Sequence, residues 1–575
     1  MRPILTLRLV RVLAVTTFCL AAGWPLAIAA PIGDSRRPEA GDATHHDAKS
    51  RLFRGPSSAH RPPLSEAIRP SGADFAAFMD RVPQQDDPFA IIDGCVAQEI
   101  TSLNAPGGAI GVMRDGQMVY AKGYGVKNRE LGGAVDADTQ FRNGSVNKMM
   151  TAAAIMQLVE RRRVDLQAPV TRYVPEFKLK DPAAADSITV WNLLTHSSGI
   201  PDLLSGYDIV GPTTDDALGA WAAKQGEVRL LAPPGSFWNY TNLGYSLAGL
   251  VVERAGGMPY HQYMSHFWTS AGMTSTTLYP SEVISRGNYS YGHSMNPATG
   301  APIIYAPNDY DNYWAAPAGF AFSTVGDLVH FADLLMTGGG NVIEPSSAAA
   351  MQAEQQTLNQ LPGTAYGFGV IVEHFGDELL LSHGGNINGF GAEVIWFPAH
   401  RFAVATLVNT DGNLSNSALC AAKVLLQLPT PDPQDYSTSP DTWTPFTGHY
   451  HILDTAITWD RTSPRGVYDL EGQVTLNDRQ LRLTFPELTE TPTSTVPFSR
   501  SLIQAFLNTF IVDFNDNKKP DDGLDVTFIT DPKQPGHATW MRDRLFVGMW
   551  EKDRLRPVLL PALWNQLAVV ATPGW

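Results

Sequence analysis

A long apolar helix directly after a serine and a lysine constrains this chain more than any other feature. Residues Phe141–Asp165 read FRNGSVNKMMTAAAIMQLVERRRVD. From Met149 to Val159, apolar side chains fall on nearly every side of the helix, which is the pattern of a helix buried in a core. We therefore expect this helix at the centre of a domain, with Ser145 at its start.

Ser145 and Lys148 lie three residues apart and so share one helix face, one turn apart. A lysine at the start of a buried helix is costly unless it is paired, and burial favours its neutral form. A neutral lysine can accept a proton from a neighbouring hydroxyl, which makes Ser145 a candidate nucleophile. The alternative is that Ser145 only caps the helix while Lys148 extends to solvent. The Ser-x-x-Lys pattern alone favours this second interpretation.

Length and composition indicate several segments. A chain of 575 residues is too long for one core. Residues 1–29 have a basic start, an apolar run and a small-residue end, which predicts a signal peptide. Residues 30–74 contain few large apolar side chains and predict a flexible leader. We expect a catalytic domain over residues 75–428, a proline-rich linker over 429–441 and a further domain over 442–575.

The residue patterns predict an α+β fold for residues 75–428. Strands are expected near both ends of this segment, and the middle is mainly helical. The predicted elements are a helix at Pro88–Leu103, a hairpin at Ala109–Ala121, strands at Tyr366–Val372, Leu379–Ser382, Glu393–Phe397 and Ala403–Val408, and a helix at Asn416–Leu426. The economical arrangement is one antiparallel sheet flanked by helices, with a helical lobe beside it and a cleft between the lobes. Short alternating runs after Thr442 predict a C-terminal all-β domain, either a barrel or a half-barrel.

Charge and ligand spacing exclude several function classes. The formal net charge is −15 at pH 7, and loss of the signal peptide would remove three arginines. We therefore expect neither nucleic acid nor an anionic membrane as a partner. Because the chain has no C-x-x-C and no H-E-x-x-H, we expect no metal site and no cofactor. No stop-transfer pattern follows the first apolar run, so no stable membrane anchor is expected after signal cleavage. Nothing in the sequence indicates an oligomeric state.

Two more motifs follow Ser145-x-x-Lys148 in a fixed order. They are Tyr240-Thr241-Asn242 and His383-Gly384-Gly385, and LLTHSSGIP at Leu193–Pro201 accompanies them. In this order they resemble the serine β-lactamase and penicillin-binding-protein superfamily. The closer likeness is to the class C β-lactamase and D,D-peptidase branch, over roughly residues 75–428.

The resemblance implies a role for each of the first two motifs. Ser145 attacks a carbonyl carbon and becomes acylated, and either Lys148 or Tyr240 takes its proton. Both alternatives stay open. Asn242 either donates to the substrate or holds Lys148 in place.

The third motif is expected to form the opposite wall of the cleft. Gly384 and Gly385 let a substrate lie close to the strand edge. In the family, backbone N–H groups at the positions of Ser145 and Asn386 hold the oxyanion.

His383 stands where many β-lactamases have lysine. Lysine is a fixed charge suited to a substrate carboxylate, whereas histidine titrates near neutrality. Such His-x-Gly variants are familiar among D,D-carboxypeptidase, D-aminopeptidase and esterase members. We therefore predict an exported serine hydrolase, periplasmic or secreted, that cleaves an amide or ester in a small-molecule or peptide substrate, most like a D,D-carboxypeptidase or D-aminopeptidase. The alternatives are an esterase or β-lactamase on the same scaffold, or a catalytically silent cell-envelope binding protein.

Four other residues receive a structural interpretation. His196 and Ser197 are expected to serve as turn and helix-cap residues. In the family fold the first and last helices pack side by side on the sheet, so the resemblance allows a disulfide between Cys95 and Cys420.

Overall fold

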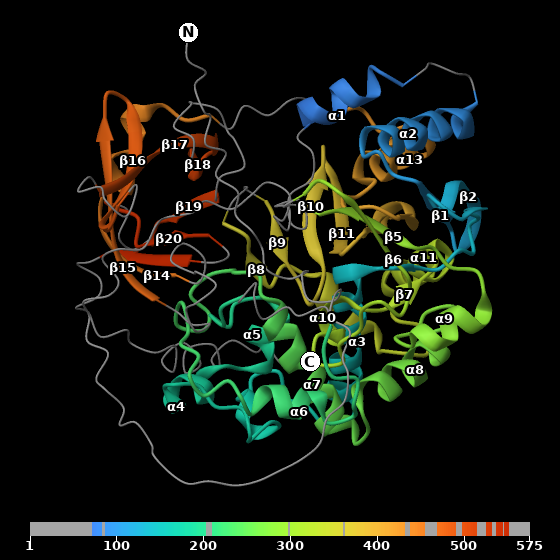
Figure 1. Ribbon diagram of the computed structural model, residues 1–575, viewed down its shortest axis with the longest axis horizontal. Coiled ribbons are helices and arrows are strands. Elements are labelled where there is room, and N and C mark those ends of the chain that lie inside the picture. The colour runs from blue at the N-terminus through green and yellow to red at the C-terminus, as the bar shows by residue number, and fades with distance from the viewer. Residues whose placement is uncertain are drawn as a thin grey trace, which may run out of the picture.

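The computed structural model describes residues 72–82, 87–202, 210–296, 299–359, 363–431, 437–454, 468–489, 497–513, 525–531, 536–543 and 546–550. The expected signal peptide and nearly all of the expected leader lie outside these residues. The described elements form a helix-flanked sheet and a separate barrel, which lies at the left of Figure 1. We call them the sheet domain and the barrel.

One antiparallel sheet organises the sheet domain. Its described strands run in the order β3-β2-β1-β13-β12-β11-β10-β9-β8. They are β1 (Gly107–Arg114), β2 (Gln117–Asn128), β3 (Gly132–Ala134), β8 (Gln356–Thr357), β9 (Ala365–Tyr366), β10 (Ile371–Phe375), β11 (Glu378–Ile387), β12 (Phe390–Phe397) and β13 (Phe402–Val408). Strand β1 pairs with β13 in the register Ile110↔Thr406, so the two ends of the segment meet in the middle of one sheet. This confirms the expected α+β fold.

The expected strand Tyr366–Val372 is wrong, because β9 and β10 are separate strands. Residues 367–370 turn out of the sheet between them. A Cβ atom on Gly367 would lie 2.1 Å from the Met351 carbonyl oxygen, and Gly369 has a φ of 74°. The turn therefore packs closely on the neighbouring helices, which an extended strand could not do.

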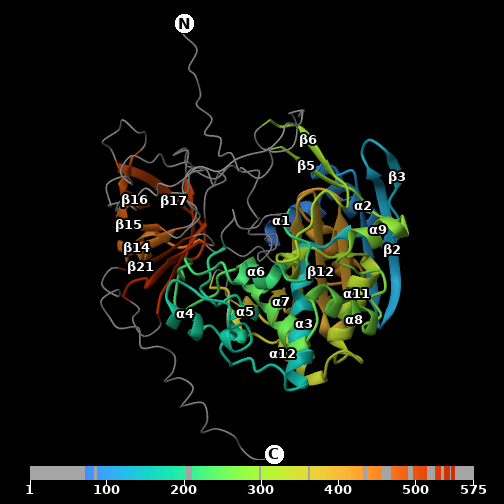
Figure 2. The same cartoon turned by 60° about the horizontal axis from the view of Figure 1, so that its bottom comes forward.

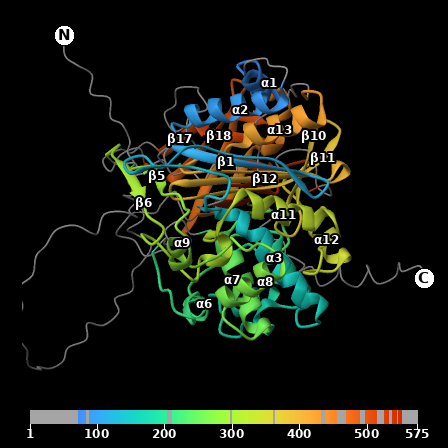
Figure 3. The same ribbon diagram turned by 90° about the vertical axis from the view of Figure 1, so that its right-hand side faces the viewer.

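Helices cover both faces of the sheet. In Figure 3, α1 (Gly72–Met79), α2 (Pro88–Ser102) and α13 (Ser415–Leu426) lie on one face, and α3, α11 and α12 lie on the other. The helices of the second face and of the helical lobe are α3 (Asn147–Glu160), α4 (Pro182–Ser187), α5 (Val190–Leu194), α6 (Ala217–Ala222), α7 (Asn242–Gly256), α8 (Tyr260–Ser270), α9 (Pro280–Arg286), α10 (Ala316–Gly319), α11 (Val325–Met336) and α12 (Pro345–Gln352). Two small ribbons join this lobe to the sheet, formed by β4 (Phe141–Arg142) with β7 (Phe322–Ser323) and by β5 (Gly292–Met295) with β6 (Pro302–Tyr305). As expected, α3 is buried along almost its whole length.

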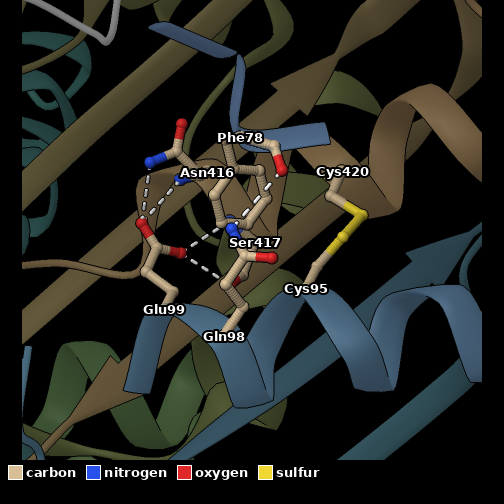
Figure 4. Close-up of a disulfide and its surroundings, with 7 residues drawn as sticks. All are labelled: Phe78, Cys95, Gln98, Glu99, Asn416, Ser417 and Cys420. Atoms are coloured by element: carbon tan, nitrogen blue, oxygen red, sulfur yellow. Dashed lines mark hydrogen bonds between the residues drawn. A yellow bond between two sulfur atoms is a disulfide. The ribbon is translucent and has the colours of Figure 1, made fainter. Parts of the chain in front are cut away.

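A disulfide and a buried carboxylate join the first and last helices of the sheet domain (Figure 4). Cys95 of α2 is bonded to Cys420 of α13, with the two Cα atoms 6.6 Å apart. One turn along, the Glu99 carboxylate accepts hydrogen bonds from the backbone N–H and the side chain of both Asn416 and Ser417. These groups lie at the start of α13, where a negative charge compensates unpaired N–H groups. The disulfide that the resemblance allowed is thus present.

The C-terminal strands close into a barrel. The described strands pair antiparallel in chain order, and β14 pairs with β21 to complete the circle. They are β14 (Gly448–Asp454), β15 (Tyr468–Asn477), β16 (Gln480–Thr489), β17 (Pro497–Phe506), β18 (Thr509–Asp513), β19 (Asp525–Ile529), β20 (Trp540–Arg542) and β21 (Phe546–Trp550). Aromatic and branched side chains such as Tyr450, Phe510 and Phe528 fill its interior. Of the two expected forms, the structure has the full barrel.

The barrel packs on the helical lobe near α4, as Figure 2 shows. Arg229 of the lobe forms a two-pronged ion pair with Asp469 of β15, with N–O distances of 2.6 and 3.2 Å. Beside it, the rings of Phe237 and Trp540 lie 5.3 Å apart, centroid to centroid. This contact places barrel residues next to the segment that leads into Tyr240.

We predict that the disulfide contributes substantially to the stability of the sheet domain. It joins residues that are 325 positions apart, so its loss frees a long loop in the unfolded chain. Replacing both cysteines with alanine is expected to lower the free energy of unfolding by about 2–4 kcal/mol, measured by urea unfolding. Wild-type protein treated with dithiothreitol serves as the control and is expected to lose the same amount. Two free thiols in non-reduced wild-type protein, detected by mass spectrometry, would contradict the prediction.

Candidate active site

Ser145 lies in a tight turn directly before the core helix. The turn spans Gly144–Val146 and precedes α3, so Ser145 is not in the first turn of the α-helix itself. Gly144 has a φ of 50°, a left-handed conformation that favours glycine. Ser145 is 5% exposed and sits where α3, α10 and β11 meet.

Lys148 is fully buried, and its ammonium nitrogen lies within hydrogen-bond distance of oxygens from three separate segments. The Nζ atom lies 3.0 Å from Ser145 Oγ, 2.8 Å from Asn242 Oδ1 and 2.6 Å from the Ala318 carbonyl oxygen. The latter two oxygens only accept, so they take two N–H bonds in either charge state of the lysine. The third position faces Ser145, to which Lys148 donates as an ammonium and from which it can accept a proton as an amine.

Tyr240 is the second side chain that contacts Ser145 Oγ. Its hydroxyl donates to Ser145 Oγ at 2.8 Å, and Lys148 Nζ lies 4.9 Å from the centre of its ring. Lys148 and Tyr240, both predicted from the first two motifs, therefore contact the same oxygen, Ser145 Oγ. Both are groups that can exchange protons, which is the arrangement that nucleophilic serine chemistry requires.

Asn242 orients Lys148, and Asp202 orients Asn242. Asn242 is the first residue of α7, and its Oδ1 accepts a hydrogen bond from Lys148 Nζ. Its backbone N–H donates to Asp202 Oδ1 at 3.0 Å. Its Nδ2 faces the other Asp202 oxygen at 3.5 Å. Of the two roles expected for Asn242, the contacts are those of holding Lys148. Sequence reasoning missed Asp202, although it directly follows the LLTHSSGIP stretch.

His383 is buried and neutral, contrary to our expectation that it titrates near neutrality. Burial, and next the charge of Lys148, lower the pKa of His383 to about 3. Its Nδ1 donates to the Gly384 carbonyl at 2.5 Å, because a carbonyl oxygen can only accept. Its Nε2 then accepts from the Tyr366 hydroxyl at 2.9 Å. No pattern in the sequence marked Tyr366 as the partner of His383.

The glycine motif brings the backbone of β11 against the nucleophile turn. A Cβ atom on Gly385 would lie 2.1 Å from the Asn143 carbonyl oxygen and 2.9 Å from the Ser145 nitrogen. A Cβ atom on Gly144 would lie 2.6 Å from the Asn386 nitrogen. We expected Gly385 to make room for a substrate, but it makes room for the turn that carries Ser145.

Asn386 contributes to this side of the site through its backbone. Strand alternation directs its side chain to the opposite sheet face, where its Oδ1 accepts from the Gly412 N–H at 3.3 Å. Beyond Ser382, β11 extends past β10 and pairs with β12 on its other side. Residues 383–387 therefore run beside Ser145 as a local strand edge.

An aromatic cluster supports Tyr240. Its ring lies 4.2 Å from the His196 ring and 6.2 Å from the Trp238 ring, and Tyr366 closes the cluster. His196 also accepts the Thr241 backbone N–H on its Nδ1 at 3.1 Å. With a φ of 54°, His196 is a turn residue as expected, but its buried ring also packs against Tyr240.

We predict that His383 makes the free energy of unfolding decrease as the pH falls. Its pKa is about 3 in the folded protein and near 6.5 when unfolded, so the unfolded chain binds the proton first. The stability that neutral His383 contributes is present above pH 6.5 and falls by about 1.4 kcal/mol per pH unit toward pH 3. Replacing His383 with glutamine is expected to remove this slope, measured by urea unfolding at pH 4 to 7. Parallel losses of stability in both proteins would refute the assignment.

Comparison with known proteins agrees with this geometry. Residues 92–428 match the Beta-lactamase family over more than half of the chain. The chain belongs to the Beta-lactamase family. Its sheet, its core helix and the residues Ser145, Lys148 and Tyr240 fall within the matched region.

Named relatives of this Beta-lactamase family member include Protein flp of Staphylococcus aureus (strain COL). The two are 24% identical over 324 residues, which are 56% of this chain and 63% of that relative. The chain thus spans less than two thirds of the length of the curated relatives it matches.

Two solved structures share the fold. The octameric penicillin-binding protein homologue from Pyrococcus abyssi has a TM-score of 0.54 at 21% identity, covering 81% of this chain and all of that one. The D-amino acid amidase from Ochrobactrum anthropi SV3 has a TM-score of 0.50 at 20% identity, covering 60% and 99%.

The described residues contain no group of three or more His, Cys, Asp or Glu side chains placed to hold a metal ion. In the same part of the chain, every helix is too short or too polar to cross a lipid bilayer.

Proposed function

We propose that this protein is an exported serine hydrolase that cleaves an amide or ester through an acyl-enzyme on Ser145. One observation carries the proposal: Ser145 Oγ contacts both Lys148 Nζ and the Tyr240 hydroxyl at hydrogen-bond distance. A serine hydroxyl is a poor nucleophile unless a neighbouring group takes its proton. Here two such groups contact the same oxygen.

The proton moves within this cluster. As Ser145 Oγ attacks the substrate carbonyl carbon, its proton passes to the Lys148–Tyr240 pair, and the pair later gives it to the leaving group. Asn242 and the Ala318 carbonyl hold Lys148 in place during this exchange. A water molecule then attacks the acyl carbonyl carbon and gives a proton to the Lys148–Tyr240 pair. The ester bond to Ser145 Oγ breaks, the pair returns the proton to Ser145 Oγ, and the acid product leaves.

The carbonyl oxygen becomes negative during the attack. The close packing of Gly144 on Asn386 and of Gly385 on Ser145 supports a shared oxyanion site for the two backbone N–H groups. Each such preorganised donor is typically worth about 3 kcal/mol in the transition state.

The third motif supports a peptidase-like substrate over a β-lactam. A neutral His383 bonded to Tyr366 and Gly384 lacks the fixed charge that lysine brings to this position. The similar D-amino acid amidase fold supports a D-amino acid residue at the scissile bond. We therefore place D-amino acid peptides and amides ahead of simple esters and cephalosporins.

A covalent serine probe tests the proposal. A fluorophosphonate is expected to label the wild-type protein once, and peptide mass mapping should locate the adduct on Ser145. Replacing Ser145 with alanine should abolish labelling, and Tyr240→Phe should slow it about 10²–10⁴-fold, the usual contribution of a proton-transfer group. Ser270→Ala, an exposed serine at the end of α8, is the matched control and should label like the wild type.

Absence of labelling in the wild type would sink the enzyme proposal and favour a catalytically silent binding protein. Given labelling, a substrate panel separates the remaining classes. Rapid turnover of cephalosporins with no cleavage of D-amino acid peptides or amides would identify a β-lactamase, and cleavage of short esters alone would identify an esterase.

We also predict export with cleavage after Ala29. The amino-terminal pattern and the Cys95–Cys420 disulfide support an oxidising compartment. Expression of the full chain in a bacterial host should yield an extracytoplasmic protein whose amino terminus, read by mass spectrometry, begins at Ala30. An intact Met1 terminus on active protein in the cytoplasm would contradict this prediction.

A further inference from the structure

A barrel arginine lies next to the aromatic cluster of the active site. Arg542 ends β20, and its guanidinium carbon lies 5.3 Å from the centre of the Trp238 ring. The Trp238 ring is in turn 6.2 Å from that of Tyr240, whose hydroxyl contacts Ser145. A residue from a separate domain thus stands one aromatic ring away from the catalytic tyrosine.

This guanidinium is buried, and the described part of the chain offers it few hydrogen-bond partners. Arg542 is 3% exposed, and its contact with the sheet domain is a long hydrogen bond from Nη2 to the Leu358 carbonyl at 3.5 Å. Its Nε has no hydrogen-bond partner among the residues that the structure describes. An arginine has five N–H donors, and leaving them unpaired in a buried site costs free energy.

The charge is also incompletely compensated. Burial lowers the pKa of Arg542 to about 10, and the neighbouring charges of Asp543 and Asp525 act against this. The group therefore stays a cation at neutral pH. Among the residues that the structure describes, no carboxylate lies within ion-pair distance of Arg542, so an anionic ligand would offset the desolvation of this cation.

A second buried donor, on the Trp238 ring beside Arg542, also lacks a hydrogen-bond partner among the described residues. The Trp238 Nε1 is buried and, within the described part of the chain, has no acceptor. Tryptophan indole N–H groups usually find a partner when buried. Two side chains in contact with each other thus each carry a buried donor that has no acceptor among the described residues, which is the condition of a site for an anionic ligand.

We propose that Arg542, with Trp238 Nε1, binds the free carboxylate of the peptide substrate at the interface of the two domains. The inference rests on the proposed function for the nature of the ligand. Neutral His383 leaves the third motif without a cation, so the charge that would recognise a carboxylate has to come from another part of the chain. Arginine suits this task because its planar fork matches a carboxylate.

Binding measurements test the proposal without requiring turnover. The full-length Ser145→Ala protein is titrated with N-acetyl-D-Ala-D-Ala and with its carboxyl-terminal amide. The free acid is expected to bind about 10- to 100-fold more tightly, which is the usual effect of a charge-assisted hydrogen bond. Adding Arg542→Gln should reduce the affinity for the acid to that for the amide. Trp238→Phe, which keeps a ring and removes the N–H, should lose part of the preference.

The matched control is Arg479→Gln, an exposed barrel arginine paired with Asp441. It should keep the full preference for the acid. Equal affinities of the starting protein for acid and amide would overturn the proposal, as would equal weakening of both ligands by Arg542→Gln, which is the signature of a structural role. If circular dichroism shows that Arg542→Gln does not fold, Trp238→Phe replaces it as the test. Loss of part of its preference for the acid over the amide would then support the proposal, and equal weakening of both ligands would overturn it. Failure of the proposed function appears separately, as absence of probe labelling in the wild type.

Discussion

The burial of Lys148 is the constraint on which the rest of the site depends. An amine in a core must be surrounded by acceptors, and here they come from three different elements: the nucleophile turn, the start of α7 and the end of α10. Meeting that requirement fixes the helical lobe on α3. The same requirement aligns the lysine with Ser145. The stability of the fold and the chemistry of the site therefore rest on one set of hydrogen bonds.

Close backbone approach is the second condition. The turn that carries Ser145 packs on β11 with no room for a side chain at Gly144 or Gly385, and Gly369 meets the Lys148 carbonyl in the same way. Backbone groups that approach this closely can act together on one substrate atom. Larger residues at these positions would separate the nucleophile from the strand edge beside it.

The barrel extends this arrangement beyond the Beta-lactamase region. It contributes Trp540 to the packing around Phe237 and places the Arg542 cation against Trp238. Phe237 and Trp238 are adjacent in the chain and precede Tyr240 by three and two residues. A domain in whose sequence we recognise no chemistry is thus in direct contact with the aromatic cluster around Tyr240.

The sequence by itself indicated most of the helices and strands, and it indicated Ser145 as the candidate nucleophile. The apolar stretch from Met149 to Val159 required a buried helix, and the ordered motifs at Tyr240 and His383 placed Ser145 in a known chemical family. These signals are local or depend only on order along the chain. The tertiary structure alone decided the state and role of the groups. It assigned Asp202 and Tyr366 as partners, turned the Asn386 side chain away from the site, made His383 neutral and brought Arg542 to Trp238. The physical reason is that hydrogen-bond pairing, burial and pKa are set by neighbours, and in this protein the decisive neighbours come from segments far apart in the chain.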